Sequence, residues 1–259
     1  MAIITLTSDW GTRDHYLPAV KGALLSRMPD AVIVDISHEI EPFDLNQASF
    51  VLRNCYHLFP KGTVHIVAIN TEADLENPHI AIRHNGHYFI GTDNGLFSLM
   101  FDTIPEEIFE IDIPQDSDYF TFPTRDVFVK AAVHLAKGGA MEELGDPLLK
   151  LFERMAFRPV ISGDAIIGKV IYTDRYENVF TNITEGLFKS ECRNRSFNIE
   201  FSVSRYRIRK INKSYGDVPE GELVALFSTT GNLEIAINKG NAASLLGLGT
   251  DDAIRIQFG

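Results

Sequence analysis

Two carboxylates flank a short polar segment near the beginning of the chain. Asp9 and Asp14 lie in the run Ser8-Asp9-Trp10-Gly11-Thr12-Arg13-Asp14, between an apolar stretch and a stretch with helical spacing. Proteins of the α/β class usually bind ligands at such strand ends, and a carboxylate offers two acceptor oxygens and a negative charge. The spacing fits a structural role equally well, in which Asp14 caps the helix and Gly11 makes a turn.

The elements that would position these residues alternate between strands and helices in the first half of the chain. Short apolar runs predict strands at 3–7, 32–36, 63–69, 80–83 and 88–91. Helical spacing predicts helices at 15–28, at 45–55 with Asp44 as N-cap, and at 125–137. Asn85-Gly86 predicts a tight hairpin. The alternation favours an α/β domain over 1–155 with a mainly parallel sheet.

The pattern changes after about residue 159. Helical signal is slight, and strand-like runs follow at 166–172, 197–203, 206–211, 223–227, 233–237 and 254–257. These runs predict a smaller all-β domain over 164–259, barrel-like or sandwich-like, reached through a linker at 149–163.

Composition narrows the function classes. A net charge of −11 argues against nucleic-acid binding and suits a small cationic ligand, although most acidic proteins are acidic only for solubility. No apolar run is long enough to predict a membrane span, and the start is typical of a first strand and not of a signal peptide. Cys55 and Cys192 lie far apart without metal-ligand spacing, so we expect free thiols and a cytoplasmic location.

Four ordered motifs carry a family resemblance. They are Thr7-Ser8-Asp9-Trp10-Gly11 with Lys21-Gly22, then Val34-Asp35-Ile36-Ser37-His38-Glu39-Ile40 with Pro42-Phe43-Asp44, then Thr92-Asp93-Asn94-Gly95-Leu96, and finally Gly240-Asn241-Ala242-Ala243. In this order and spacing the chain resembles the S-adenosylmethionine hydroxide adenosyltransferases, whose relatives include the fluorinases and chlorinases. The resemblance covers essentially the whole chain, including the change from an α/β to a β domain.

This resemblance implies a reaction and an assembly. Water or halide attacks the ribose C5′ carbon of S-adenosylmethionine and expels methionine, without a cofactor or metal. The site must align the nucleophile with C5′ and sulfur, strip it of water, and hold both ends of the substrate. The resemblance also implies a homotrimer, in which each active site lies between the N-terminal domain of one subunit and the C-terminal domain of the next.

Substrate-binding roles follow from the same resemblance. Asp9 matches an aspartate that bonds both ribose hydroxyls, and Phe43 matches an aromatic ring against the sugar. Asp14 and Asp174 match acids near the methionine ammonium. The other implied contacts are the Asp93-Asn94 motif, the adenine-reading amide of Asn178, stacking rings at Tyr176 and Phe180, backbone groups around Asn241 and Ala243 for adenine, and Thr229 at the amino-acid end.

Plainer structural interpretations exist for several of these residues. Tyr176 and Phe180 could be ordinary core aromatics, which is the commoner fate of such residues. Asp93-Asn94-Gly95 could be only a turn before a helix, and Asp174 could be a strand-end acid that faces solvent.

The positions that activate water in the family carry different residues in this chain. Hydroxide-using relatives carry an aspartate, an arginine and a histidine, and the matching positions here are Asn70, Asn77 and Pro123. An asparagine can hold a water but cannot take its proton at neutral pH. General-base help is worth roughly 10²–10⁴ in rate, whereas alignment alone can supply about 7–11 kcal/mol. Alignment and a good sulfonium leaving group therefore allow slow hydrolysis without the triad.

Three functions stay open at this point. The first is an S-adenosylmethionine-binding protein that still hydrolyses its ligand to adenosine and methionine, with Asn70, Asn77 and Thr124 in a remodelled nucleophile pocket. The second is a non-catalytic protein that binds an adenosyl compound or nucleoside. The third is an enzyme with another nucleophile, which Thr124 favours because halogenating relatives place a serine or a small residue there.

Two further acids lie in the loop that contains Asn70. Glu72 and Asp74 could replace the lost carboxylate from a shifted position, although the preferred interpretation is that they are solvated loop acids. His79 lies just before the strand expected at 80–83, and we expect it to face outward.

Overall fold

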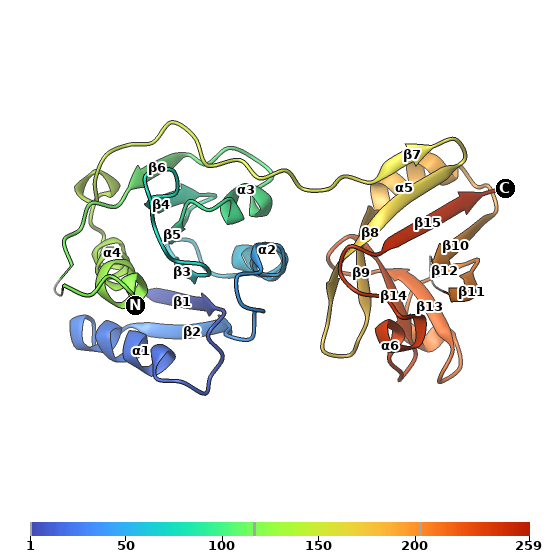
Figure 1. Cartoon of the computed structure of the whole chain (residues 1–259), viewed down its shortest axis with the longest axis horizontal. Helices are drawn as coiled ribbons and strands as arrows, with labels where there is room; N and C mark the ends of the chain where they lie inside the picture. The colour runs from blue at the N-terminus through green and yellow to red at the C-terminus, as the bar shows by residue number, and fades with distance from the viewer. Residues whose placement is uncertain (1, 116–117, 202–203) are drawn as a thin grey trace. The chain divides into compact units, whose positions relative to one another are not determined.

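The computed structural model describes residues 2–115, 118–201 and 204–259. The chain divides into two compact units, Met1–Met155 and Ala156–Gly259 (Figure 1). Each unit contains its own sheet and its own buried apolar core.

A six-stranded mixed sheet forms the centre of the first unit. Its order is β2 (Val32–Ser37), β1 (Ile3–Ser8), β3 (Val64–Ala68), β5 (His87–Thr92), β4 (His79–His84) and β6 (Glu107–Glu110). β1 is parallel to β2 and β3, and β3 is parallel to β5, whereas β4 is antiparallel to both of its neighbours. The expected α/β class is confirmed, with a sheet that is parallel on one side and antiparallel on the other.

Helices cover both faces of this sheet (Figure 1). α1 (Tyr16–Arg27) and α4 (Val129–Ala136) pack on one face, and α2 (Leu45–Arg53) and α3 (Leu96–Met100) pack on the other. Asp44 accepts a hydrogen bond from the Gln47 N–H over 2.9 Å, so the expected N-cap of α2 is confirmed. The helix expected at 125–137 divides into a π turn at Thr124–Phe128 and α4. Short 3₁₀ turns lie at Tyr56–Leu58 and Met141–Glu143.

The hairpin between β4 and β5 forms where Asn85-Gly86 predicts it. His84 pairs with His87 across the turn, and Asn85 and Gly86 have φ angles of 51° and 77°. Both residues are left-handed, as a two-residue turn of this type requires. The antiparallel side of the sheet therefore begins at a turn that the sequence encodes locally.

Parallel pairing brings the carboxyl ends of four strands to one edge of the sheet. β1, β2, β3 and β5 end there, and each is followed by a segment with polar residues. In open α/β sheets ligands bind outside these carboxyl ends. The fold therefore predicts a ligand-binding site at this edge of the sheet.

The second unit contains one curled nine-stranded sheet. In sheet order its strands are β11 (Ser204–Ile208), β10 (Phe197–Phe201), β15 (Ala253–Phe258), β8 (Ala165–Thr173), β9 (Val179–Thr184), β14 (Asn232–Ile237), β13 (Leu223–Phe227) and β12 (Ile211–Asn212), while β7 (Val160–Ser162) pairs with β8. Residues 202–203 of the strand expected at 197–203 lie outside the described residues. Barrel-like closure of this sheet stays a prediction.

The expectation of an all-β second domain is wrong in one respect. The unit also contains α5 (Glu185–Cys192), α6 (Ala242–Leu246) and a 3₁₀ turn at Tyr215–Asp217. Thr184 caps α5 by accepting the Leu187 N–H over 3.3 Å, and Phe188 anchors the helix in the core. The local cap is strong, but one buried residue in eight leaves little periodic signal in the sequence.

None of the helices in the described ranges is long and apolar enough to cross a membrane. Cys55 and Cys192 are free thiols, as expected, and both are half-buried. Burial raises the pKa of the Cys55 thiol to about 11.

Candidate functional site

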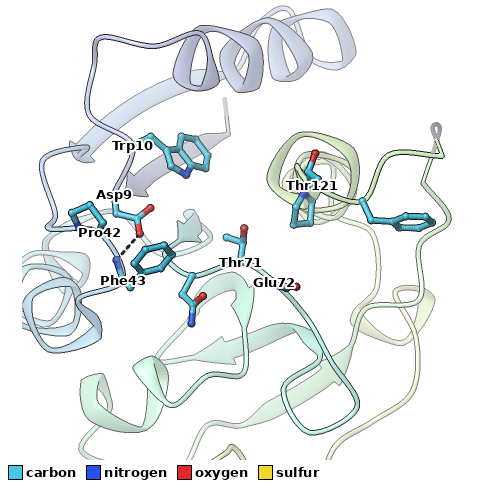
Figure 2. Close-up of a pocket in the computed structure, with 10 residues that line it drawn as sticks. Asp9, Trp10, Pro42, Phe43, Thr71, Glu72 and Thr121 are labelled. Carbon is cyan, nitrogen blue, oxygen red and sulfur yellow. Dashed lines mark hydrogen bonds between the residues drawn. The ribbon is translucent and has the colours of Figure 1, made fainter.

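A pocket of about 520 Å³ opens at the carboxyl edge of the first sheet (Figure 2). Four segments line it: Asp9 and Trp10 after β1, Pro42 and Phe43 before α2, Asn70, Thr71 and Glu72 after β3, and Phe120, Thr121 and Pro123 before the π turn. Small-molecule sites commonly have roughly 300–1,000 Å³. The structure thus brings Asp9, Phe43 and Asn70 together in one cavity of nucleoside-compatible size.

Asp9 is tied to the neighbouring Pro42-Phe43 segment of the pocket lining. The Phe43 backbone N–H donates to Asp9 Oδ2 over 2.9 Å (Figure 2). Phe43 has a φ of 68°, a left-handed conformation that costs a residue with a side chain about 1–2 kcal/mol. The bond to Asp9 helps to hold this strained loop. Asp9 Oδ1 accepts no hydrogen bond from the residues that the structure describes, so it remains available to a ligand.

The motif residues around Asp9 form a connected polar chain. Ser8 Oγ and His38 Nδ1 share a hydrogen bond of 2.7 Å, His38 Nε2 lies 3.2 Å from Asp35 Oδ1, and Lys21 Nζ donates to Asp35 Oδ2 over 2.6 Å. Partial burial raises the pKa of Asp35, but Lys21 and His38 outweigh it and leave the pKa below its usual value. This chain ties the ends of β1 and β2 to α1 and thereby fixes the place of Asp9.

An aromatic wall stands beside Asp9. The ring centroids of Trp10 and Phe122 are 5.5 Å apart in an edge-to-face arrangement, and Tyr16 lies 6.0 Å from Trp10 and 5.3 Å from Phe122. Trp10 is the sole tryptophan of the sequence and lines the pocket. Its fluorescence will therefore report on this pocket and on the folding of the first unit.

Asn94 holds the loop that contains Asn70. Its Nδ2 donates to the backbone carbonyls of Ile69 (3.0 Å) and Asn70 (3.1 Å), and its Oδ1 accepts the Leu96 N–H. Asn70 is left-handed, with a φ of 47°, and an asparagine tolerates that conformation better than most residues. Asn94 is buried and is not among the lining residues, so in this structure it positions the pocket wall.

Replacing Asn94 with alanine should destabilise the first unit and loosen the pocket. Ile69 is buried, and a buried carbonyl left without a donor costs about 1–3 kcal/mol, whereas the carbonyl of the exposed Asn70 can turn to water. We expect a lower midpoint in urea denaturation followed by Trp10 fluorescence. The matched control is Asn46→Ala, an exposed position on α2, which should change stability by no more than about 0.5 kcal/mol. Equal midpoints for the two variants would show that the Asn94 bonds are dispensable.

Asn77 is engaged within its own loop. Asp74 Oδ1 accepts the backbone N–H groups of Glu76 and Asn77, each over 2.8 Å, and the Asn77 side-chain amide over 3.2 Å. These bonds hold the pKa of Asp74 below its usual value. Asn77 and Asp74 are not among the lining residues, so the structure does not bring Asn77 beside Asn70 in the pocket.

Two other acids assigned to substrate binding lie outside the lining. Asp14 is exposed, and α1 begins after His15 without a side-chain cap, so the interpretation of Asp14 as a helix cap is wrong. Gly11 does make the expected turn, with a φ of 67°.

Asp93 is buried and its Oδ2 accepts the Phe152 N–H over 2.9 Å, while its Oδ1 has no donor among the described residues. Burial raises the pKa of Asp93.

Thr124 begins the π turn directly behind Pro123. Pro123 lines the pocket, and the Thr124 side chain is fully buried with no hydrogen-bond partner for its Oγ1 among the residues described. Short π segments occur frequently at functional sites. An unpaired buried hydroxyl beside a pocket wall can serve a water or an anion.

In the second unit, Asp174 organises the turn between β8 and β9. Its Oδ1 accepts the backbone N–H groups of Tyr176 (2.9 Å) and Asn178 (2.8 Å), and its Oδ2 accepts the Asn178 amide over 3.1 Å. Asn178 is buried, whereas Tyr176 is 77% exposed and free to meet a ligand. Asp174 is half-buried and bonded in this way, which differs from a strand-end acid that only faces solvent.

Glu177, which is not among the residues predicted from the sequence, joins this turn to α6. Its backbone carbonyl accepts the Ala243 N–H over 3.0 Å, and its carboxylate accepts the Ser244 N–H (3.0 Å) and the Asn241 amide (3.2 Å). The structure therefore brings Asn241 and Ala243 to the Asp174–Asn178 turn. Glu177 is left-handed, with a φ of 61°, which only the structure shows.

The remaining candidates of the second unit lie on neighbouring strands. Phe180 is buried on β9 with its ring centroid 5.8 Å from that of Tyr172, and Thr229 is exposed in the turn between β13 and β14. Sequence reasoning also missed Glu234, a buried acid that accepts the Tyr215 hydroxyl over 2.6 Å. Burial raises the pKa of Glu234 despite that hydrogen bond, and the charge of Asp174 adds to the rise.

The protein has two units, with a strand-end pocket that contains two acids in the α/β unit and a hydrogen-bonded turn at Asp174–Asn178 in the β-rich one. The S-adenosylmethionine hydroxide adenosyltransferase models match both: the N-terminal domain over residues 4–145 and the C-terminal domain over residues 168–255. The chain belongs to this family. The loss of the family triad at Asn70, Asn77 and Pro123 stays a prediction.

Relatives of known name span the chain. An (R)-S-adenosyl-L-methionine hydrolase of Methanocaldococcus jannaschii is 33% identical, with 99% of this chain and 96% of that protein covered. A hydrolase of the same name from Thermus thermophilus is 30% identical over 99% of this chain and all of that protein. A Nocardia brasiliensis fluorinase is 27% identical over 70% of this chain and 71% of its own length. A crystal structure of an uncharacterized conserved protein from Thermotoga maritima has a TM-score of 0.88 at 32% identity, covering 98% of this chain and 99% of that one.

Proposed function

We propose that this chain hydrolyses S-adenosylmethionine to adenosine and methionine. The observation that carries the proposal is the pocket at the carboxyl edge of the first sheet, where Asp9 keeps one carboxylate oxygen available beside Phe43 and Trp10. Support also comes from the family and from hydrolases that match nearly the full chain at 30% and 33% identity.

Each part of S-adenosylmethionine has a candidate binding partner among the residues of the chain. Asp9 accepts both ribose hydroxyls, and Phe43 packs against the sugar. Asp174 faces the methionine ammonium, and Asn178 reads the adenine edge. The other candidate contacts are Asp14, Asp93 and Asn94, the rings of Tyr176 and Phe180, Thr229, and the backbone at Asn241 and Ala243. Methionine leaves as a neutral thioether, so the leaving group needs no acid.

The test is product formation. The purified chain is incubated with S-adenosylmethionine, and adenosine and methionine are separated by chromatography and quantified. Equal amounts of the two products, formed in proportion to protein, are expected. Formation no faster than in buffer would contradict the proposal.

A non-catalytic nucleoside-binding protein is the second candidate, because Pro123 and Asn70 occupy pocket positions where neither can take a proton. It predicts saturable calorimetric binding of S-adenosylmethionine without turnover.

The third candidate is an enzyme that uses another nucleophile, and the unpaired Thr124 hydroxyl favours it. It predicts turnover that depends on the anion, so equal rates in fluoride, chloride and bromide would exclude it.

We further propose that the chain acts in the cytoplasm as a homotrimer with its sites at subunit interfaces. The free thiols of Cys55 and Cys192 support a reducing compartment. The division of candidate contacts between the two units supports a site completed by association. Light scattering coupled to size exclusion should give three times the mass of the 29.0 kDa chain, and a monomer mass would contradict the assembly.

A further inference from the structure

The pocket contains two carboxylates, and one of them already has a structural partner. Among the ten lining residues only Asp9 and Glu72 carry an acidic side chain, and none is a histidine. Asp9 holds the Phe43 N–H, and its free oxygen is the one available to the ribose. Glu72 is therefore the one lining residue that is a candidate for the general base.

The other acid of this loop is already committed. Asp74 accepts three hydrogen bonds from Glu76 and Asn77, which stabilise its ionised form and oppose proton uptake. Glu72, in contrast, takes part in no hydrogen bond or ion pair of the residues that the structure describes. The Glu72 side chain is exposed and lines the pocket, so it can turn toward a ligand.

The two residues before Glu72 are each held by a hydrogen bond to a backbone carbonyl. Asn94 donates to the carbonyl of Asn70, two residues before Glu72, and His79 Nε2 lies 2.9 Å from the carbonyl oxygen of Thr71, directly before it. His79 does not face outward as expected: it is half-buried, with its ring 4.9 Å from that of Phe128. Burial lowers the pKa of His79, so the ring is neutral and its Nε2–H donates to the Thr71 carbonyl. His79 is not among the residues that line the pocket, so it is not placed to act on a water there. Figure 2 shows Thr71 and Glu72 on this wall, between Phe43 and Thr121.

We propose that Glu72 is the general base of the hydrolysis and replaces the water-activating acid that the sequence lacks at Asn70. This inference rests on the proposed function. The carboxylate of Glu72 takes a proton from the water held at Asn70, and the water oxygen forms a bond to C5′. The C5′–sulfur bond breaks and its electron pair stays on sulfur, giving neutral methionine and adenosine. Glu72 then returns the proton to solvent, so that atoms and charge balance.

Glu72→Gln is the variant that tests this role, because it keeps the shape of the side chain and removes its basicity. We expect kcat to fall by roughly 10²–10⁴. The dissociation constant for S-adenosylmethionine, followed through Trp10 fluorescence, should change by no more than about twofold, since the lost interaction belongs to the transition state. Hydroxide should substitute for the missing base, so kcat of the variant should rise with pH between about 7 and 9.5 while that of the wild type stays flat.

Glu76→Gln is the matched control, an exposed acid of the same loop that does not line the pocket. It should keep wild-type kcat and a flat profile. Wild-type turnover in Glu72→Gln, or a loss of binding that accounts for the whole loss of rate, would overturn the role of Glu72 while leaving hydrolysis in place. Absence of adenosine from the wild type would overturn both.

Discussion

Replacing Asp9 with alanine should lower kcat/KM for S-adenosylmethionine by about 10²–10⁴. The carboxylate is expected to accept two ribose hydroxyls, and a hydrogen bond to a charged group contributes about 1.5–3 kcal/mol. Two such bonds correspond to about two to four powers of ten in rate. Initial rates of adenosine release at several substrate concentrations measure the effect.

Two further variants separate binding from loop geometry. Asp9→Asn keeps an acceptor for the Phe43 N–H but replaces one carboxylate oxygen with a donor, so it should retain the loop and still lose most of the activity. Asp30→Ala, at an exposed acid in the turn after α1, should behave as wild type. If Asp9→Asn were as active as wild type while Asp9→Ala was not, Asp9 would be a support for the loop and not a ribose ligand.

The residues that resemble the family motifs could be found from the sequence, but their roles could not. Lys21, Asp35, His38 and Ser8 belong to three separate motif segments, and the fold joins them in one polar chain. For Asn94 the resemblance implies a substrate contact, which stays a prediction, and the structure adds its bonds to the carbonyls of Ile69 and Asn70. Such contacts depend on the register of β1, β3 and β5, which a linear pattern does not contain.

Local signals predicted the elements better than they predicted the site. The Asn85-Gly86 turn and the Asp44 cap follow from the chemistry of a few adjacent residues, and both are confirmed. Glu72 and Asp74 look alike in the sequence, two residues apart in one loop. The hydrogen bonds of Asp74 and the free side chain of Glu72 distinguish them only in three dimensions.

Three of the four buried histidines of the first unit, His65, His84 and His87, lie near the amino-terminal ends of β3 and β5, and they should make the unit sensitive to acid. His65 is fully buried, shares a 2.7 Å hydrogen bond with Thr5, and lies 3.3 Å from His87 between ring nitrogens. Burial, assisted by His87, lowers the pKa of His65 to about 3. Burial also lowers the pKa of His84 and His87.

The direction of the pH effect follows from these pKa values. In the unfolded chain a histidine has a pKa of about 6.5, so below that pH the unfolded state binds a proton that the folded state refuses. The stabilisation is complete above pH 6.5 and is lost as the pH falls toward the folded pKa of about 3. Between pH 6.5 and 4, His65 alone should remove about 3 kcal/mol from the free energy of unfolding.

Urea denaturation of the wild type at pH 7.5, 6, 5 and 4, followed by Trp10 fluorescence, should therefore show a falling midpoint in the first unit. Burial raises the pKa of Asp93, which acts in the opposite direction, so the comparison of variants is decisive. His65→Phe keeps a ring stacked near Phe89 and cannot take up a proton, and its free energy of unfolding should fall less steeply with acid even if it is lower at pH 7.5. His57→Gln, at an exposed histidine nearby, should keep the wild-type slope. Equal slopes for wild type and His65→Phe would mean that the buried imidazole takes up its proton without unfolding, and the acid sensitivity would have to arise elsewhere.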